Sequence, residues 1–158
     1  MRGKAAKKRV IAPDAKYGSV LLAKFINHVM MDGKKSIAQR VVYEALKEIE
    51  DTTKKDALKI FEEAIKNVMP QVEVKSRRVG GANYQVPMPV RGDRQLALSF
   101  RWVIDAARAK KGKPIAQKLS TVIAEAGQNL GDAIKKRDDM HRMAEANKAF
   151  AHFARFAK

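Results

Sequence analysis

Apolar side chains recur three and four positions apart along most of the chain, which is the spacing of one face of an α-helix. This pattern predicts six helices joined by short connections. Serine, threonine, aspartate and proline are typical of helix starts, while glycine and proline are typical of helix ends. The expected starts lie at Ser19, at Ser36, at Asp56 or Thr53, at Asp93, at Pro114 and at Asp132, and the last helix runs from Ala133 to about Phe153.

One segment, 72–90, departs from the helical pattern. From Val72 onward, small or apolar side chains alternate with charged ones, which is the two-residue period of a β-strand. Gly80 and Gly81 follow, and glycine readily adopts the positive φ of a tight turn. Pro87 and Pro89 lack the N–H group that an inner strand needs, so the second strand cannot lie inside a larger sheet. The pattern therefore predicts one β-hairpin over about 72–90.

The predicted elements fit a single helical architecture. Short connections favour antiparallel packing of neighbouring helices, and 158 residues with 46% hydrophobic side chains are enough for one core. No repeat and no linker divides the chain. We expect a mainly α fold, a single bundle of about six helices with one protruding two-stranded antiparallel hairpin and a flexible basic N-terminal arm over residues 1–12. The whole chain, 1–158, is interpreted as one domain.

The charge of the chain is strongly one-sided. Lys and Arg number 33 against 17 Asp and Glu, a net charge of +16. Seven of the acids fall between Glu44 and Glu63 beside four lysines, so this window carries −3 and the other 138 residues carry +19. A surplus of this size attracts polyanions. Nucleic acid is therefore the expected partner, and the acidic window is expected to face away from it.

The sequence lacks the motifs of common catalytic sites. It contains no G-x-x-x-x-G-K-[ST], no G-x-G-x-x-G after a predicted strand and no G-x-S-x-G. It has no cysteine, and no apolar run approaches the roughly 18 residues of a membrane span. His141 and Glu145 are four apart on one helical face, which suits a metal, but an exposed polar pair is the favoured interpretation. We expect no enzyme activity, no metal, no cofactor and no membrane partner.

Two aromatic side chains leave alternatives open. Trp102 can stack on a base or pack beneath Arg101, and its apolar neighbours favour packing. Tyr84 follows the turn of the hairpin, where an exposed ring suits stacking on a base and cross-strand packing equally well.

Four segments of the chain carry a resemblance to a known family. They are Gly18-Ser19 through Met31-Asp-Gly-Lys-Lys-Ser36, Val72 through Gly81, Tyr84-Gln-Val-Pro87 with Arg101-Trp102, and Lys135-Lys-Arg through His152. In order and spacing they resemble the universal small-subunit ribosomal protein family that is numbered seven in the bacterial scheme. The resemblance covers essentially the whole chain.

The resemblance implies a helical bundle with one hairpin, in agreement with the pattern above. It implies a structural constituent of the ribosome, cytoplasmic and in the small subunit, that binds the 3′ major domain of small-subunit ribosomal RNA as a primary binder and nucleates assembly of the subunit head. It also implies that the hairpin lies near the exit-site tRNA and the messenger RNA path. The implied protein partners are neighbouring head and platform proteins, including the small-subunit protein numbered eleven.

The chain departs from the family pattern in two places. Where the family commonly has two arginines after Val90-Arg91, this chain has Gly92-Asp93-Arg94-Gln95, so the second basic contact is missing. Near the end, Ala154 separates Phe153 from Arg155.

Lysine and arginine supply phosphate contacts, while RNA shape and unstacked bases are recognised in loops and junctions. The expected rRNA-binding residues are Arg2, Lys4, Lys7, Lys8 and Arg9 of the arm, then Lys34, Lys35, Lys75, Arg77, Arg78, Arg94, Arg101, Arg108, Lys110, Lys111 and Lys113, together with His141 and Arg142. The hairpin-tip residues expected nearest the tRNA are Arg78, Val79, Gly80, Gly81 and Tyr84.

Two other functional classes are compatible with the charge. A helical DNA-binding protein would bind duplex DNA as well as structured RNA, but no segment is marked as a recognition helix. A basic RNA-modifying enzyme would need a catalytic or cofactor-binding cluster, which the sequence lacks. Comparing affinity for small-subunit ribosomal RNA fragments with affinity for duplex DNA separates these classes.

Overall fold

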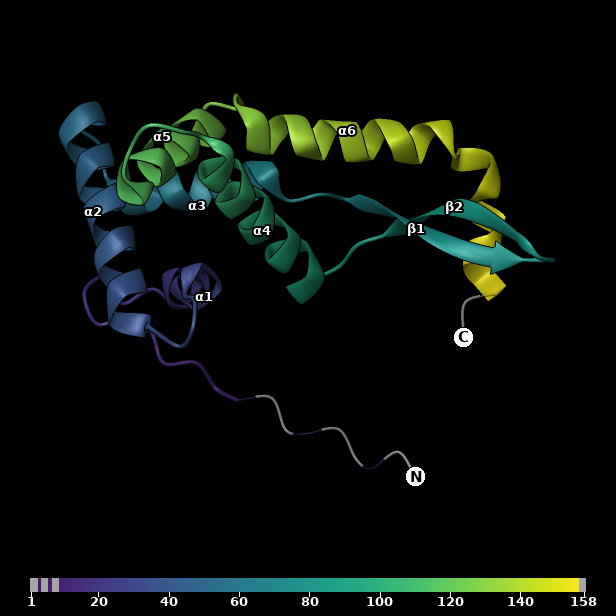
Figure 1. The fold of residues 1–158 in the computed structure, drawn as a ribbon, viewed down its shortest axis with the longest axis horizontal. Coiled ribbons are helices and arrows are strands. Elements are labelled where there is room, and N and C mark those ends of the chain that lie inside the picture. Colours follow the sequence, from purple (N-terminus) through teal and green to yellow (C-terminus); the bar gives the residue numbers. More distant parts are fainter. Residues whose placement is uncertain (1–2, 4–5, 7–8, 157–158) are drawn as a thin grey trace.

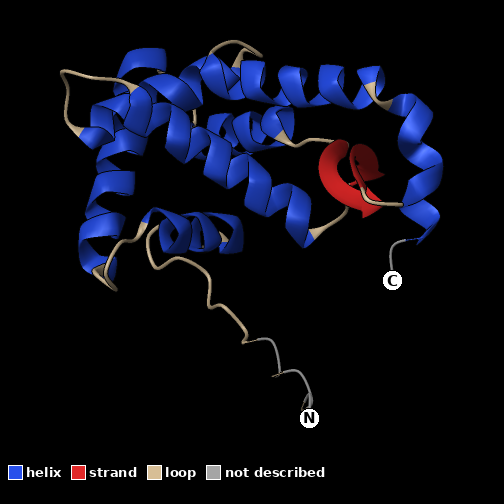
Figure 2. Cartoon of the chain, turned by 45° about the vertical axis from the view of Figure 1, so that its right-hand side comes forward, coloured by secondary structure: helices blue, strands red, loops and turns tan. Residues whose placement is uncertain are grey.

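A computed structural model describes residues 3, 6 and 9–156 of the chain. Its elements are α1 (Val20–Val29), α2 (Lys35–Thr53), α3 (Ala57–Val68), β1 (Val72–Val79), β2 (Ala82–Pro89), α4 (Asp93–Ala109), α5 (Ile115–Gly127), α6 (Asp132–Ala146) and a 3₁₀ segment η1 (Lys148–Phe156). Helices α1 to α5 pack together at one end, and α6 runs from them toward the hairpin (Figures 1 and 2). The expected mainly α bundle with one hairpin is confirmed.

The core of the bundle centres on three fully buried phenylalanines. The Phe25 ring centroid lies 5.1 Å from that of Phe61 and 5.3 Å from that of Phe100, so α1, α3 and α4 meet at this point. Burying a side chain of this size contributes about 1.5–3 kcal/mol. Trp102 is also buried, at 6% exposed, which confirms the packing interpretation of this residue.

Two of the predicted helix caps are confirmed. The Ser19 hydroxyl accepts a hydrogen bond from the Leu22 N–H at 3.3 Å, and the Asp56 carboxylate accepts one from the Leu58 N–H at 2.9 Å. Each bond satisfies a backbone donor that the first turn of a helix leaves unpaired.

The other predicted starts are displaced by one or two residues. Lys34, not Ser36, precedes α2 and makes no side-chain cap bond. Asp93 and Asp132 are the first helical residues rather than caps, because Gly92 and Gly131 precede them with φ values of 51° and 90°. The two carboxylates lie in the first turn, where the positive end of the helix dipole favours them. Pro114 directly precedes α5.

The last predicted helix is divided in two. α6 ends at Ala146, and Asn147 donates a side-chain hydrogen bond to the Met143 carbonyl at 2.8 Å. Asparagine side chains compete for backbone groups in this way and favour helix ends. The chain then turns and continues as η1 beside β2 (Figure 1). The prediction of one helix to Phe153 was therefore wrong.

The hairpin has the predicted position and turn. Val72 pairs with Pro89, and the register continues to Val79 opposite Ala82. Gly80 and Gly81 form the two-residue connection with φ values of 57° and 90°, as a primed turn requires.

Asp14 fixes the point at which the N-terminal arm leaves the bundle. Its buried carboxylate accepts hydrogen bonds from the Lys16 and Tyr17 N–H groups, each at 3.1 Å, and from the Tyr43 hydroxyl at 2.7 Å. Burial, reinforced by the bond to Asp14, raises the pKa of Tyr43 to about 12. The arm from Arg9 onward is thereby attached to α2.

Candidate nucleic-acid interface

The root of the hairpin is built around the buried carboxylate of Glu73. Only 6% of Glu73 is exposed, and its two oxygens lie 2.8 Å from Lys75 Nζ and 2.9 Å from Arg94 Nη2. Burial raises the pKa of Glu73, but the hydrogen bonds and charges of Lys75 and Arg94 outweigh burial and hold the pKa below its usual value. Two predicted RNA-binding residues thus form ion pairs within the protein.

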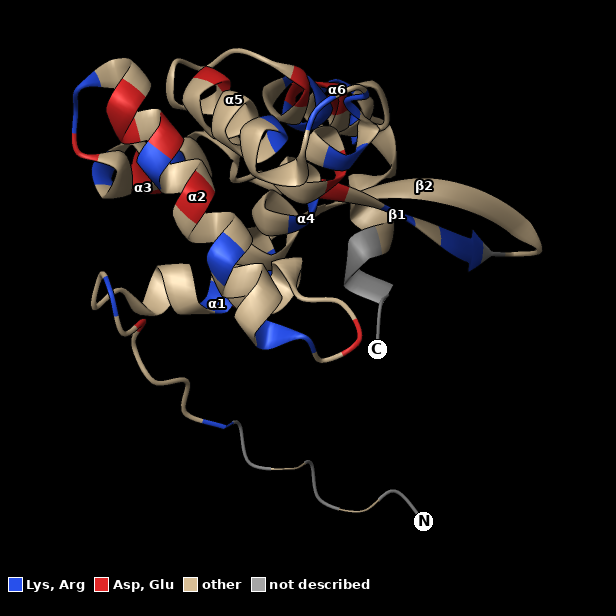
Figure 3. Ribbon diagram, turned by 60° about the vertical axis from the view of Figure 1, so that its left-hand side comes forward, with Lys and Arg blue, Asp and Glu red and all other residues tan. Residues whose placement is uncertain are grey.

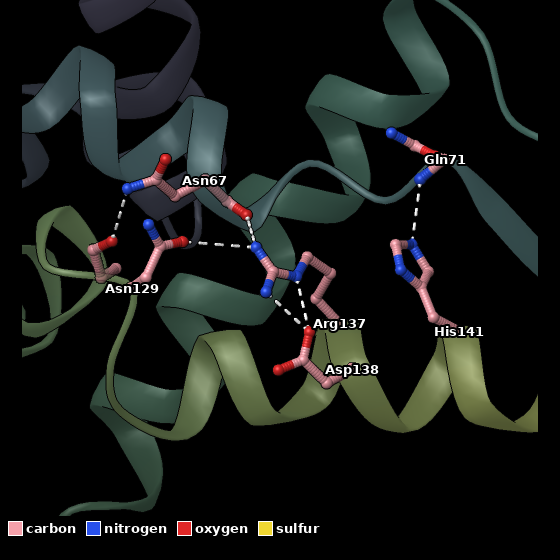
Figure 4. A network of polar contacts seen from close by, with 7 residues as sticks. Asn67, Gln71, Asn129, Arg137, Asp138 and His141 are labelled. Carbon is pink, nitrogen blue, oxygen red and sulfur yellow. Dashed lines mark hydrogen bonds and ion pairs between the residues drawn. The ribbon is translucent and has the colours of Figure 1, made fainter.

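Two further hydrogen bonds join this root to the bundle, and a third closes the base of the hairpin. The Gln95 amide donates to the Pro70 carbonyl at 3.0 Å, and the Val90 N–H donates to the Gln71 carbonyl at 3.0 Å. The Gln71 N–H donates to Nε2 of His141 at 3.1 Å, so His141 connects α6 to the hairpin (Figure 4). Gln95 stands where the family commonly has arginine, and here it serves as a structural contact.

Arg137 and Asn67 together join α6, α3 and α5. Its guanidinium donates to the Asn67 carbonyl at the end of α3 and pairs with Asp138 at 2.7 Å (Figure 4). The Asn67 amide donates in turn to the carbonyls of Ala126 and Gly127 at 3.1 Å each. These bonds satisfy carbonyls that helix ends leave open, and they fix α6 on the bundle.

The two basic residues of the hairpin tip differ in environment. Arg78 is exposed, whereas Arg77 is half-buried and its Nε is buried without a hydrogen-bond partner in the described part of the chain. Arg77 lies opposite Tyr84. The Tyr84 ring packs against Phe150 and Phe153 of η1 at centroid distances of 5.2 and 5.0 Å. This packing against the C-terminal segment is a third environment, beyond the two that the sequence suggested for Tyr84. Of the other predicted tip residues, Gly80 and Gly81 are exposed.

Residues 9–11 of the arm lie beside α1 and α4. Arg2, Lys4, Lys7 and Lys8 lie outside the described residues, while Arg9 is described and exposed. Arg9 lines a pocket of about 460 Å³ together with Lys24, Asn27, His28 and other residues of α1 and α4. The structure thus brings Arg9 beside side chains that the sequence did not single out for binding.

His28 forms one wall of this pocket. Its ring meets Phe100 edge-on at a centroid distance of 5.3 Å. Partial burial, with a smaller contribution from the positive charge of Arg101, lowers the pKa of His28. A neutral imidazole there can both donate and accept a hydrogen bond. Arg101 itself is exposed on α4.

Lys34 and Arg108 lie at the rim of a second pocket. This mostly apolar pocket of about 260 Å³ is lined from α1, α2, α4 and α5. Ile37 and Met31 contribute to its wall and are 54% and 62% exposed. Lys35 is exposed at the start of α2 and lines a separate pocket with Arg9.

The lysines between α4 and α5 divide into two kinds. Lys110 pairs with Glu125 of α5 at 2.9 Å and is partly buried. Lys111 and Lys113 are exposed. On α6, Arg142 is exposed and lies 3.6 Å from Asp139.

The acidic window lies on α2 and α3. Figure 3 shows acidic side-chain positions along these two helices, at the end of the bundle remote from the hairpin. The hairpin contributes basic positions along β1, and further basic positions lie on α1 and α4. The seven acids of the window thus gather at the end of the molecule remote from the hairpin, whereas α6 carries acidic and basic residues side by side.

Sequence reasoning missed the contacts that hold the hairpin root. Glu73 was assigned only as one charged residue in an alternating strand, and Gln95 only as a departure from a pattern. A single acid in a strand whose other charged residues, Lys75, Arg77 and Arg78, are all basic is the one local signal that could have indicated an internal ion pair. The bonds of Asn67 and His141 join residues about 60 or 70 positions apart and leave no local signal.

The comparisons with known proteins agree with this architecture. The sequence profile of the family described as Ribosomal protein S7p/S5e matches residues 1–148. The chain belongs to this family. It is 56% identical to the small ribosomal subunit protein uS7 of Thermotoga maritima over 97% of this chain and 99% of the relative. It is 55% identical to uS7 of Marinobacter nauticus over 96% of this chain and 97% of the relative.

Family membership settles the general class of function. The protein is a structural constituent of the small ribosomal subunit, not an enzyme, and in bacteria such proteins work in the cytoplasm. RNA binding and translation are implied by the family. Within the described residues there is no group of three or more acidic or histidine side chains that could hold a metal. No described helix is long and apolar enough to cross a membrane.

Replacing Glu73 with glutamine tests the hairpin root. Near neutral pH the free energy of unfolding should fall by about 1–2 kcal/mol, because two charge-assisted bonds are weakened while Lys75 and Arg94 remain half-exposed. Folding lowers the pKa of Glu73, so its contribution is present above the unfolded pKa and is lost as pH falls through the folded value. The difference between wild type and variant should therefore disappear in acid, as measured by urea unfolding between about pH 3 and pH 7.

The matched control is Glu145→Gln, which removes an exposed ion pair with Lys148 on α6. It should change the unfolding free energy by less than about 0.5 kcal/mol. If the two substitutions lower the free energy of unfolding equally, or if the Glu73→Gln effect persists in acid, the ion pairs of Glu73 do not stabilise the hairpin root.

Proposed function

We propose that this protein is a primary binder of the 3′ major domain of small-subunit ribosomal RNA and that it nucleates assembly of the subunit head. The observation that carries the proposal is the position of the acid-rich window, 44–63, at the end of the bundle remote from the hairpin. The arm, α1, α4 and β1 carry exposed cations such as Arg9, Arg78 and Arg101, while the acids of the net −3 window lie on α2 and α3.

Two groups of cations differ in what they can offer RNA: those for which no ion pair is described and those paired with Glu73 or Glu125. Lys35, Arg78, Lys111 and Lys113 are exposed, so a phosphate can approach them. Lys75, Arg94 and Lys110 are engaged by Glu73 or Glu125 and remain available only through their outer N–H groups. We infer that the exposed group supplies most of the phosphate contacts and that the paired group supports the surface.

The pocket beside Arg9 supports recognition of an unstacked nucleotide. It is lined by the Phe100 and His28 rings, by Asn27, and by Lys24, which lies 3.9 Å from the Asp93 carboxylate in the same pocket. Aromatic and amide groups suit an unstacked base, as RNA loops and junctions present it, and Arg9 offers a cation for its phosphate.

The hairpin tip is proposed to lie near the exit-site tRNA and the messenger RNA path, with Arg78 and the Gly80-Gly81 turn as the nearest residues. These residues are exposed and carry few groups that folding requires. Neighbouring head and platform proteins, including the small-subunit protein numbered eleven, are proposed partners. The protein is proposed to act as one domain over its whole length.

RNA binding should be tight, specific and steeply dependent on salt. Each neutralised phosphate releases counterions, so affinity for a 3′ major domain fragment should fall by about 10³-fold or more between roughly 50 and 200 mM salt. Filter binding or fluorescence titration measures this slope, with arbitrary duplex DNA of equal length as the control. A flat salt response, or equal affinity for the duplex, would contradict the proposal.

Shortening the hairpin tip should separate folding from function. Replacing residues Arg78 to Asn83 with a Gly-Asn turn should cost well under the roughly 2 kcal/mol of a core truncation, because the exposed tip buries little apolar area. Incorporation into reconstituted small subunits should persist, while exit-site tRNA occupancy falls or frameshifting rises.

The matched control for this change is Gln85→Ala, an exposed position on the same face as Arg78 but nearer the root. It should leave folding, incorporation and tRNA occupancy unchanged. If the shortened hairpin incorporates and shows normal tRNA occupancy and normal frame maintenance, the tip has no role in tRNA contact.

A further inference from the structure

The C-terminal segment η1 lies against one face of the hairpin and not the other. Residues paired across the strands share a face, so Arg77 lies with Tyr84 and Lys75 with Val86. On this face Val86 is fully buried and Tyr84 is half-buried, whereas Arg78, Asn83 and Gln85 on the opposite face are exposed. The covered face is the one that meets α6 and η1 (Figure 1).

The 3₁₀ geometry of η1 explains how it packs on Tyr84. Side chains three residues apart eclipse one another in a 3₁₀ helix. Phe150 and Phe153 accordingly stack nearly parallel, with an interplanar angle of 12° and a centroid distance of 6.3 Å. Tyr84 meets both rings at centroid distances near the optimum for aromatic pairs, 5.2 and 5.0 Å.

The hairpin needs such a lateral contact because its root contacts act at one end only. The bonds of Glu73, Gln71 and Gln95 lie where the strands leave the bundle. An isolated two-stranded hairpin is marginally stable in water, and its strands of 8 residues each reach well beyond the root. A contact at Tyr84, near the turn, restrains the other end.

We propose that Phe150 and Phe153 are positioning residues, which brace the hairpin through Tyr84 and thereby set the direction in which the Arg78 face points. The buried Nε of Arg77, opposite Tyr84, is consistent with a surface closed at this point. The brace leaves Arg78 free because Arg78 lies on the other face. This inference concerns the free protein and does not depend on the proposed RNA contacts.

The absence of cysteine from the chain permits a direct test on the full-length protein. Nitroxide labels are placed at Asn83→Cys beside the turn and at Lys47→Cys on α2, both exposed positions. Pulsed dipolar spectroscopy then gives the distribution of distances between tip and bundle. In the labelled reference protein this distribution should be narrow.

Removing both rings with Phe150→Ser and Phe153→Ser should widen the distribution by about twofold or more, because the end of the hairpin near the turn then loses its aromatic contact with η1 and the hairpin is held only by its root and by α6. Amide exchange in β2 around Tyr84 should become faster by about tenfold or more. Replacing both phenylalanines with tyrosine keeps the rings and should restore the narrow distribution. Leu130→Ser, which removes a 60% exposed apolar side chain elsewhere, should leave it unchanged.

A second variant that ends at Asn147 removes the brace without introducing polar side chains and should match the double serine variant. If both variants keep a narrow distribution, the root alone sets the direction of the hairpin and the inference is wrong. The inference is also wrong if Leu130→Ser widens the distance distribution as much as the double serine variant does. It is likewise wrong if the double tyrosine variant does not restore the narrow distribution.

Discussion

The buried carboxylate of Glu73 is the contact on which the arrangement of bundle and hairpin depends. It receives Lys75 from its own strand and Arg94 from α4, so one side chain joins the hairpin to the helices. Leaving a buried carboxylate unpaired is costly, and here two half-exposed cations offset that cost. The hydrogen bonds of Gln95 to Pro70 and of His141 to Gln71 act at the same place, so α4 and α6 both hold the root.

This arrangement separates the basic residues into two groups with different roles. Lys75, Arg94 and Lys110 pair with Glu73 or Glu125 and stabilise the fold. The acids of α2 and α3 lie at the far end of the bundle (Figure 3), so the cations of the arm, α1, α4 and the hairpin tip keep an excess of positive potential. We propose that RNA binds this exposed basic side and leaves the acidic window uncovered.

The elements were predictable from sequence because their signals are local. Helical spacing, the Ser19 and Asp56 caps and the Gly80-Gly81 turn all act within a few residues, and the structure confirms each of them. The caps predicted at Asp93 and Asp132 were wrong. A glycine of positive φ, Gly92 or Gly131, precedes each helix, so the acid is already in the first helical turn. The division between α6 and η1 was missed because a 3₁₀ segment has nearly the same apolar spacing as an α-helix. The environments of Tyr84 and Arg94 could not be predicted, since both depend on residues far away in the chain.

Lysine footprinting by mass spectrometry, with the full-length protein free and bound to a 3′ major domain RNA fragment, shows directly which side of the protein the RNA covers. A small acylating reagent modifies exposed amines, and RNA slows the modification of those that it covers. If RNA covers the basic side, Lys35, Lys111 and Lys113 should be protected from modification. The reactivity of Lys54, Lys55 and Lys59, which are also exposed but belong to the acidic window, should not change. Protection of Lys54, Lys55 and Lys59, with Lys35, Lys111 and Lys113 still reactive, would contradict the proposal.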